Sequence, residues 1–275
     1  MKQILLFTLI TMVYGSYAQE SEPVHINPED YKWENTEKFI LKSDVLSQEK
    51  EIYVSLPENF NDSTKYPVVL VLEGEILFET FAPLTRLMAE VNEIPECLVV
   101  GIPLYNKHLE YAPKISKIPE SGNADKMLEF YKTELFPVLE ANYNCNDQRI
   151  LWAHSGLGGI FCTYLLVGPD RQFSGILSSS PNLKFLQEDY LTKENVFESV
   201  KGKGKLFYYL TFGSNEDEAY MGRMFQQTKE LKERLENEAP ENLVWKYRLY
   251  EGNNHFTNAI ETYMDGLILY FNLMD

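Results

Sequence analysis

Cysteine is scarce in this 275-residue sequence, and its three positions, Cys97, Cys145 and Cys162, form no recognisable pattern. An odd number makes no complete set of disulfides, and Cys97 and Cys162 lie in apolar stretches where a free buried thiol is expected. No cysteine or histidine spacing is typical of a metal site, so we predict that the protein binds no metal.

Positive charge is also in the minority, with 25 Lys and Arg against 41 Asp and Glu and a net charge of -16. Such acidity argues against nucleic acid and anionic membrane surfaces as partners, because either would repel the chain. Apolar runs of bilayer-spanning length are missing as well. The run at residues 4–13 is too short to cross a membrane.

The first eighteen residues have the pattern of an export signal. Lys2 provides the positive start, residues 4–13 the apolar core, and the small residues up to Ala18 a cleavage site, so cleavage before Gln19 is expected. The alternative is a buried N-terminal strand. We therefore expect residues 1–18 to be a signal peptide and residues 19–275 a single domain that is periplasmic or secreted.

Apolar patterning in the remainder predicts an α/β fold. Residues 37–45 and 50–56 alternate apolar with polar side chains, as antiparallel strands do when one face meets water. Continuous apolar runs predict buried strands at residues 67–72, 96–102, 150–153, 175–180 and 206–212, and residues 243–250 complete the set. Helical patterns separate these strands, the first at about residues 78–91. The sequence therefore predicts a mostly parallel central sheet with antiparallel N-terminal strands and helices on both faces.

One serine stands among small residues between the strand at 150–153 and the helical pattern at 157–167. Strand, tight turn and helix form a nucleophile elbow, in which the serine hydroxyl projects above the edge of the sheet. Ser155 is therefore the candidate nucleophile. An ordinary glycine-rich turn with a serine N-cap would have the same pattern and stays an alternative.

A histidine base can be assigned by elimination. His25, His108 and His154 precede Ser155, and His255 alone follows it, in a polar loop between a strand and a helix. In α/β-hydrolases the order along the chain is serine, acid, histidine, so the base is His255. His154 lies next to the serine in a strand, which directs its side chain to the other face, and we expect it to pack in the core.

The loop after the strand at 206–212 offers the acid. It contains Glu216, Asp217 and Glu218, and a carboxylate here would accept the other ring N–H of the histidine. Glu216 is the first choice and Asp217 the second. An acidic loop is also typical of a solvated surface, and spacing does not choose between the two residues.

Several segments resemble the esterase group of α/β-hydrolases, which includes siderophore, feruloyl and acetyl-xylan esterases, S-formylglutathione hydrolases and mycolyltransferases. The similarity runs over most of the chain after the signal. Residues 66–75 (YPVVLVLEGE) are similar to the family's YPVLYLLDGE, residues 94–102 (IPECLVVGI) to IPEMIVVGI, and residues 122–128 (GNADKML) to GGADKFL. Residues 180–183 resemble the start of SPSLWW.

The resemblance also carries roles for single residues. Residues 213–216 match the family's GxxE that supplies the acid, and residues 252–255 match the G-x-x-H that supplies the base. It implies His255 as base, with Glu216 orienting it. Backbone N–H groups near Gly74 and Glu75, and that of Gly156 after the nucleophile, are implied as oxyanion donors.

Two departures from the family pattern are plain. The family reads G-H-S-x-G-G, and aligning Ala153 to Ser155 with G-H-S requires one extra residue before Gly158. The other alignment needs no insertion but puts Gly156 in the nucleophile's place. The family's N-x-D-R-x-R-D-x-T-P segment survives only in outline at residues 106–113, so its substrate contacts are not carried over.

The function predicted from the sequence is an exported serine carboxylic-ester hydrolase that works through an acyl-enzyme and needs no cofactor. Its substrate would be a small-molecule or glycan-linked ester, and Tyr105, Tyr111 and Phe256 hint at a ring-bearing one. Two alternatives stay open. One is a non-catalytic binding module on the same fold, and the other is an acyltransferase with the same three residues.

Overall fold

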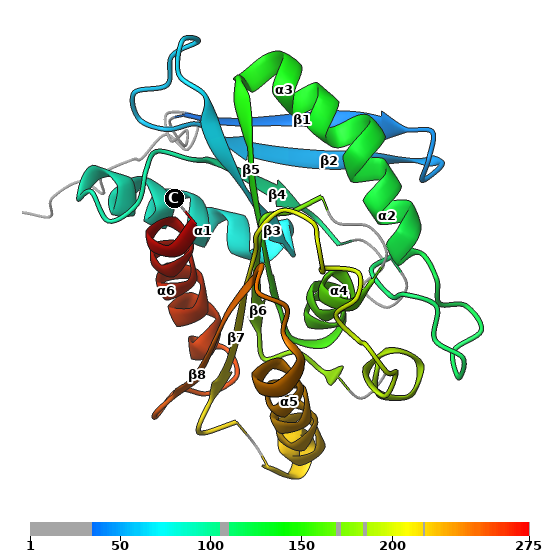
Figure 1. Cartoon of the computed structure of the whole chain (residues 1–275). Coiled ribbons are helices and arrows are strands. Elements are labelled where there is room, and N and C mark those ends of the chain that lie inside the picture. The colour runs from blue at the N-terminus through cyan, green and yellow to red at the C-terminus, as the bar shows by residue number, and fades with distance from the viewer. Residues whose placement is uncertain (1–34, 105–109, 169–171, 184–185, 217, 275) are drawn as a thin grey trace, which may run out of the picture. The chain divides into compact units, whose positions relative to one another are not determined.

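The fold is organised around an eight-stranded sheet with the strand order β1-β2-β4-β3-β5-β6-β7-β8 (Figure 1). It is seen in a computed structural model that describes residues 35–104, 110–168, 172–183, 186–216 and 218–274. The predicted signal segment lies outside these residues. From Asn35 onward the described chain packs as one unit.

The strands fall into an antiparallel edge and a parallel centre. They are β1 (Thr36–Ser43), β2 (Gln48–Ser55), β3 (Tyr66–Leu72), β4 (Leu98–Ile102), β5 (Cys145–His154), β6 (Gly175–Ser179), β7 (Leu206–Gly213) and β8 (Leu243–Tyr250). β2 pairs antiparallel with β1 and β4, and the remaining pairs are parallel. β3, β4, β6 and β7 are buried at every position, whereas β1 and β2 keep exposed positions. The predicted mostly parallel sheet is confirmed.

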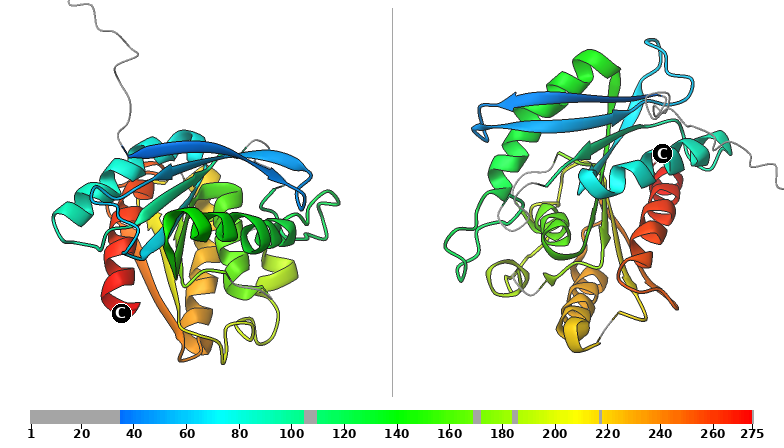
Figure 2. Two further views of the ribbon diagram at one scale, coloured as in Figure 1. Left: turned by 90° about the horizontal axis from the view of Figure 1, so that it is seen from above. Right: turned by 180° about the vertical axis from the view of Figure 1, so that it is seen from behind.

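Helices cover both faces of the sheet (Figure 2). α1 (Gly74–Glu90) and α6 (Thr257–Met274) pack on one face. The other face carries α2 (Ala124–Phe130), α3 (Phe136–Tyr143), α4 (Ser155–Val167) and α5 (Glu218–Glu238). A π-helical turn, Tyr131–Leu135, joins α2 to α3, and another lies at Gln187–Leu191. No helix in the described part of the chain is both long and apolar enough to cross a membrane.

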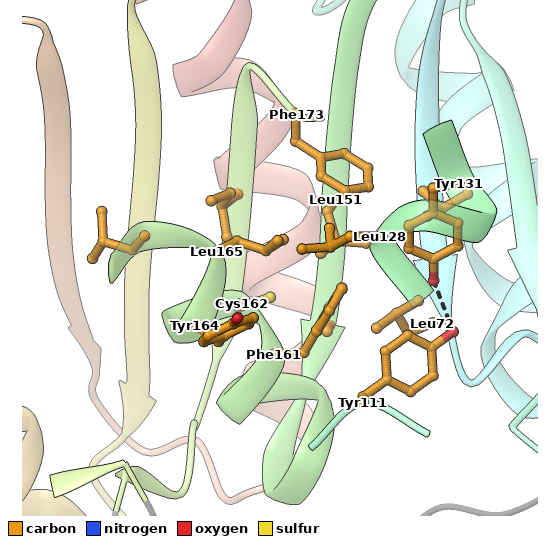
Figure 3. Close-up of a cluster of buried hydrophobic side chains, with 14 of the residues drawn as sticks. Leu72, Tyr111, Leu128, Tyr131, Leu151, Phe161, Cys162, Tyr164, Leu165 and Phe173 are labelled. Carbon is orange, nitrogen blue, oxygen red and sulfur yellow. Dashed lines mark hydrogen bonds between the residues drawn. The ribbon is translucent and has the colours of Figure 1, made fainter. Parts of the chain in front are cut away.

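Aromatic side chains fill the core between the sheet and the helices α2 to α4 (Figure 3). Tyr111 is fully buried there, with its ring against Phe161 and its hydroxyl 2.8 Å from that of Tyr131. Each such side chain contributes about 2 kcal/mol when it leaves water. The suggestion that Tyr111 contacts a ring-bearing substrate is therefore wrong, because the residue is part of the core.

Two further details concern the start of α1 and the three cysteines. α1 begins at Gly74 rather than near residue 78, and it contains Pro83. Cys97, Cys145 and Cys162 are all free and buried.

Candidate active site

Ser155 lies at the sharp turn between β5 and α4. His154 before it is extended, with φ -122° and ψ 146°, and Ser155 itself has φ 59°, in the left-handed region. A non-glycine residue there costs of order 1 kcal/mol or more, and such residues gather at functional sites. The turn therefore has the strained geometry expected of a nucleophile elbow.

Gly156 takes up the extra residue that separates this sequence from the family pattern. Its φ of 5° and ψ of -111° lie outside the helical region, so the first turn of α4 is kinked there. Beyond the kink, Gly159 packs so closely on Pro181 that a Cβ would come within 2.5 Å of the Pro181 Cα. The residue that directly follows the strand in a left-handed conformation is Ser155, which favours the alignment with Ser155 in the nucleophile's place.

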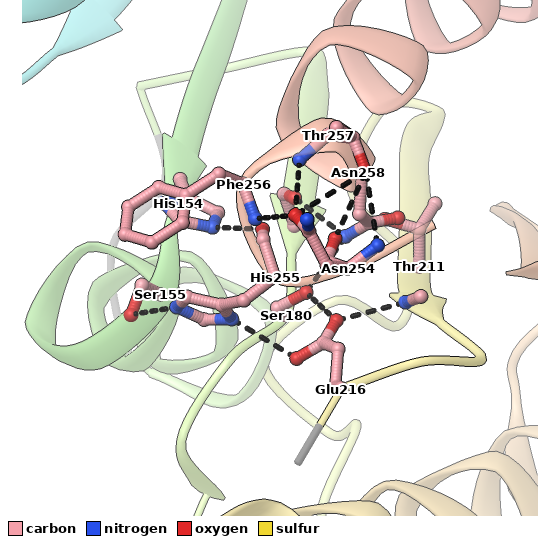
Figure 4. Close-up of polar contacts among 12 residues, drawn as sticks. His154, Ser155, Ser180, Thr211, Glu216, Asn254, His255, Phe256, Thr257 and Asn258 are labelled. Carbon is pink, nitrogen blue, oxygen red and sulfur yellow. Dashed lines mark hydrogen bonds and ion pairs between the residues drawn. The ribbon is translucent and has the colours of Figure 1, made fainter. Parts of the chain in front are cut away.

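His255 and Glu216 meet Ser155 at this edge of the sheet (Figure 4). The His255 Nε2 lies 2.8 Å from the Ser155 Oγ, and the His255 Nδ1 lies 2.9 Å from the Glu216 Oε2. Glu216 follows β7 and His255 follows β8, so three strand ends supply the three side chains. With Nδ1–H donating to the carboxylate, Nε2 is left to accept the serine proton.

The Glu216 carboxylate is held from both sides. Its side chain is 3% exposed, and its Oε1 accepts from the Ser180 hydroxyl at 2.5 Å and from the Gly213 N–H at 2.8 Å. Burial alone would raise the pKa of Glu216. The hydrogen bonds from His255, Ser180 and Gly213 outweigh it and keep this pKa below its usual value. The carboxylate is therefore ionised at neutral pH.

Comparison with known proteins places this chain in a family. A model of the family described as "Putative esterase" matches residues 43–265, which is most of the chain. The chain belongs to this esterase family. It is an ester hydrolase of the α/β-hydrolase kind, as the resemblance predicted.

Individual relatives of the esterase agree in length and fold. It is 22% identical over 245 residues to the ferri-bacillibactin esterase BesA of Bacillus subtilis, covering 81% of this chain and 84% of that one. The crystal structure of the BES protein from Bacillus cereus superposes with a TM-score of 0.76 at 27% identity, covering 89% and 97% of the two chains. The siderophore hydrolase EstA of Aspergillus nidulans has a TM-score of 0.75 at 19% identity, covering 91% and 98%.

Ser180 and Asn258 extend the polar network of the esterase, and the sequence prediction missed both. The Asn258 amide donates to the Ser180 Oγ at 2.7 Å and to the Ser179 Oγ at 2.8 Å, and Ser180 in turn donates to Glu216. Asn258 lies in the first turn of α6 and is fully buried. The Ser-Pro pair at the end of β6 was the available signal for Ser180, since it belongs to the family pattern.

Three adjacent strands of the parallel sheet end in a left-handed residue that is not glycine. Glu73 after β3 has φ 59°, Ser155 after β5 has φ 59°, and Ser180 after β6 has φ 47°. The other five non-glycine residues with positive φ in the described chain are asparagines and one serine elsewhere: Asn35, Ser47, Asn92, Asn144 and Asn195. Backbone strain is thus aligned along the edge that carries the polar cluster.

The predicted oxyanion donors follow two neighbouring parallel strands. Gly74 and Glu75 come after β3, and Gly156 comes after β5, which pairs with β3 with Val71 opposite Trp152. Gly74 and Glu75 form the first turn of α1, where backbone N–H groups have no carbonyl of their own helix to bind. A Cβ on Gly74 would lie 2.6 Å from the Ile102 N, so only glycine lets α1 start this close to β4.

His154 is buried, as expected, but its ring does not point away from the site. Its Nε2 lies 2.8 Å from the His255 carbonyl oxygen, and the two rings have centroids 4.4 Å apart. Burial, and to a smaller degree the nearby His255, lowers the pKa of His154 to about 4. The ring is therefore neutral at pH 7. Because a carbonyl oxygen only accepts, the proton is on Nε2.

The remaining predicted residues divide between exposed and undescribed. Phe256 is 76% exposed, next to His255, with its ring 5.5 Å from the imidazole. It is the one of the three suggested aromatic residues that the described structure places beside the site. Tyr105, His108 and Asp217, the second choice for the acid, lie outside the described residues.

Proposed function

We propose that this protein is an exported serine esterase in which Ser155, His255 and Glu216 form a catalytic triad. The observation that carries the proposal is the unbroken chain of hydrogen bonds from the Ser155 Oγ through the His255 ring to the Glu216 carboxylate. A lone serine in a tight turn would need neither a buried carboxylate nor a histidine in this tautomer.

The geometry gives each residue a step. The Ser155 Oγ attacks the ester carbonyl carbon while its proton passes to the His255 Nε2. The imidazolium, held by Glu216, then protonates the leaving alcohol as the ester C–O bond breaks. Water attacks the acyl-enzyme with His255 again as base, which releases the acid and restores the serine.

Backbone N–H groups of Gly74, Glu75 and Gly156 are the proposed donors to the oxyanion. Each well-placed donor is worth roughly 3 kcal/mol in such sites. The start of two helices, α1 and α4, at this point adds favourable dipoles for the developing negative charge. The Gly156 N–H is the donor whose position the kink in α4 changes.

We further propose siderophore-type esters as the substrate class. The support is that BesA is named as a ferri-bacillibactin esterase and EstA as a siderophore hydrolase. The exposed Phe256 ring beside His255 is compatible with a substrate that carries rings. Export is supported by the sequence of residues 1–18, and sequencing of the mature N-terminus should give Gln19 as the first residue.

The test is the variant Ser155→Ala, with Ser63→Ala in an exposed loop as the matched control. We expect hydrolysis of p-nitrophenyl acetate to fall at least about a thousandfold in Ser155→Ala, with the melting temperature within about 3 °C of wild type. The control should retain full activity, and a fluorophosphonate probe should label wild type and the Ser63→Ala control but not Ser155→Ala. Unchanged turnover in Ser155→Ala would refute the triad.

A substrate panel tests the finer proposal. Siderophore trilactones, feruloyl esters and acetyl-sugar esters are compared by kcat/KM, and the trilactones should rank first. Adding sugar alcohols as acceptors distinguishes hydrolysis from acyl transfer, since a transferase would give the new ester as product. A higher kcat/KM for acetyl-sugar esters would overturn the siderophore assignment while leaving the triad intact.

A further inference from the structure

His154 joins the nucleophile to the loop that carries the base. It is the last residue of β5 and directly precedes Ser155, so whatever binds its side chain is one peptide unit from the nucleophile. Its Nε2–H donates to the main-chain carbonyl of His255, a residue 101 positions away in the sequence (Figure 4). The bond therefore fixes the two halves of the proposed machinery to each other.

The loop at residues 251–256 is attached to its surroundings at two points. On the acid side, the Asn215 N–H donates to the Asn253 carbonyl at 2.9 Å, and the Gly252 N–H donates to the Ser214 hydroxyl at 2.8 Å. On the nucleophile side, the main chain of the loop is attached by the bond from His154, which among the described residues is the one hydrogen bond that the His255 carbonyl accepts. Without it, the main chain of the loop would be fastened beside the acid, and the His255 side chain alone would link the loop to the serine.

The surroundings of His154 suit a fixed, neutral donor. His154 is 5% exposed, and its ring stacks near Trp152 with an interplanar angle of 11°, while the centroid of the Phe256 ring lies 6.0 Å from its own. A cation at this place would oppose the imidazolium that His255 becomes during the reaction, because the two rings are 4.4 Å apart. A neutral ring supplies the hydrogen bond without that repulsion.

We infer that His154 is a positioning residue, whose Nε2–H holds the His255 main chain and so sets the reach of the His255 Nε2 to the Ser155 hydroxyl. The inference rests on the proposed function, since it assigns a role within the same triad. It goes beyond it because the residue touches neither the substrate nor the reacting atoms.

Three variants separate the donor from the ring. His154→Gln keeps an N–H near the Nε2 position without the ring, and His154→Phe keeps a ring without the donor. Trp152→Phe disturbs the same buried cluster but leaves the hydrogen bond in place. We expect His154→Phe to lower kcat for p-nitrophenyl acetate about tenfold with KM within about twofold, because alignment is lost rather than binding. His154→Gln and Trp152→Phe should stay within about threefold of wild type.

A second measurement needs no substrate. Hydrogen exchange of the amides in residues 251–258 should be faster in His154→Phe than in wild type, and unchanged in His154→Gln and Trp152→Phe. Should His154→Phe not fold, His154→Asn replaces it, since its shorter amide does not reach the carbonyl. The inference would be overturned if the variant without the donor, His154→Phe or His154→Asn, had the kcat and the exchange rates of wild type. It would also be overturned if all three variants lost kcat to the same extent. If wild type itself shows no Ser155-dependent hydrolysis, the triad fails, and the exchange result still decides whether His154 holds the loop.

Discussion

The two edges of the parallel sheet make a useful comparison. At the carboxyl edge, Ser155, His255 and Glu216 converge in a hydrogen-bonded polar network. At the amino edge, the structure has a cavity of about 670 Å³ between the end of α1 and the start of β4, lined in part by Arg86, Glu96 and Cys97. The cavity is roomy, but no histidine is among the residues that line it.

The same contrast holds for reactivity. Burial, and then the nearby Glu96, raises the pKa of the Cys97 thiol, so the thiol stays protonated and unreactive. Ser155, in contrast, is 2.8 Å from a histidine nitrogen that is free to take its proton. Cavity size therefore says less about catalysis than the presence of a base within hydrogen-bond distance of a nucleophile. Substitutions at the carboxyl edge should therefore lower activity, whereas substitutions at the amino edge should not.

The largest effect is expected from Glu216→Gln, with Glu58→Gln at the cavity as its matched control. The Gly213 N–H binds the carbonyl oxygen of the new amide, which turns the NH2 toward His255 and forces the proton onto the wrong ring nitrogen. We expect kcat to fall by roughly a hundredfold to ten-thousandfold, and Glu58→Gln to match wild type. Initial rates of p-nitrophenyl acetate hydrolysis measure the effect. Equal losses of kcat in Glu216→Gln and Glu58→Gln would contradict the difference between the two edges.

Acid should destabilise the protein through the carboxyl edge. The pKa of His154 is about 4 when folded and 6.5 when unfolded, so the unfolded chain binds one more proton between these values and stability falls as the pH drops below 6.5. From pH 7 to pH 5 this proton uptake should lower the free energy of unfolding by about 2 kcal/mol. Glu216, whose folded pKa is lowered from 4.5, adds its loss only at lower pH.

Urea unfolding of wild type and His154→Gln at pH 7 and pH 5 measures this term. The variant lacks the titrating group. Between pH 7 and pH 5 its free energy of unfolding should therefore fall by about 2 kcal/mol less than that of wild type. Parallel curves for the two proteins would show that His154 does not carry the pH dependence.

A smaller effect is expected from Ser180→Ala. The change removes one of the hydrogen bonds that lower the pKa of Glu216 and leaves its Oε1 with the Gly213 N–H alone among the described partners. We expect kcat to fall about tenfold and the acid limb of the pH profile to move to higher pH, because the carboxylate is then easier to protonate. Ser180→Thr, which keeps the hydroxyl, is the control, and an unmoved acid limb in the alanine variant would contradict the role of Ser180.

The smallest effect on activity is expected at the amino edge. Arg86→Met removes the guanidinium that donates to the buried Ser55 hydroxyl. Stability should fall by about 1 to 2 kcal/mol because that hydroxyl loses its partner, while kcat and KM stay at wild-type values. A clear loss of kcat would show that the two edges are coupled.

The sequence predicted the strands well because strands buried on both faces are continuous apolar runs. β3 and β7 differ from their predicted bounds by a residue at one end. The start of α1 was missed because Glu73 and Gly74 are usual in turns, and the left-handed Glu73 that begins the helix leaves no mark in the pattern. Chain order along an α/β-hydrolase was enough to select His255, whereas Glu216 was singled out from its neighbour Asp217 by the resemblance of residues 213–216 to the family's GxxE.

Contacts between distant segments were out of reach. Nothing local to Ser180 or Asn258 shows that the two meet, because the pair is 78 positions apart. The side of β5 to which His154 points follows the alternation of the strand, since its ring stacks near that of Trp152 two residues earlier. What the sequence did not show is that the His255 loop lies against that side, so that His154 contacts the loop that carries the base.

The kink at Gly156 bears on how such enzymes are recognised from sequence. Helix α4 absorbs one additional residue directly after Ser155 while the packing of Gly159 on Pro181 further along stays tight. The length of this turn is therefore a variable, and a search that demands a glycine two places after the serine would discard chains of this kind. Searches for such esterases should allow a longer turn after the serine and should require an acid and a histidine further along the chain.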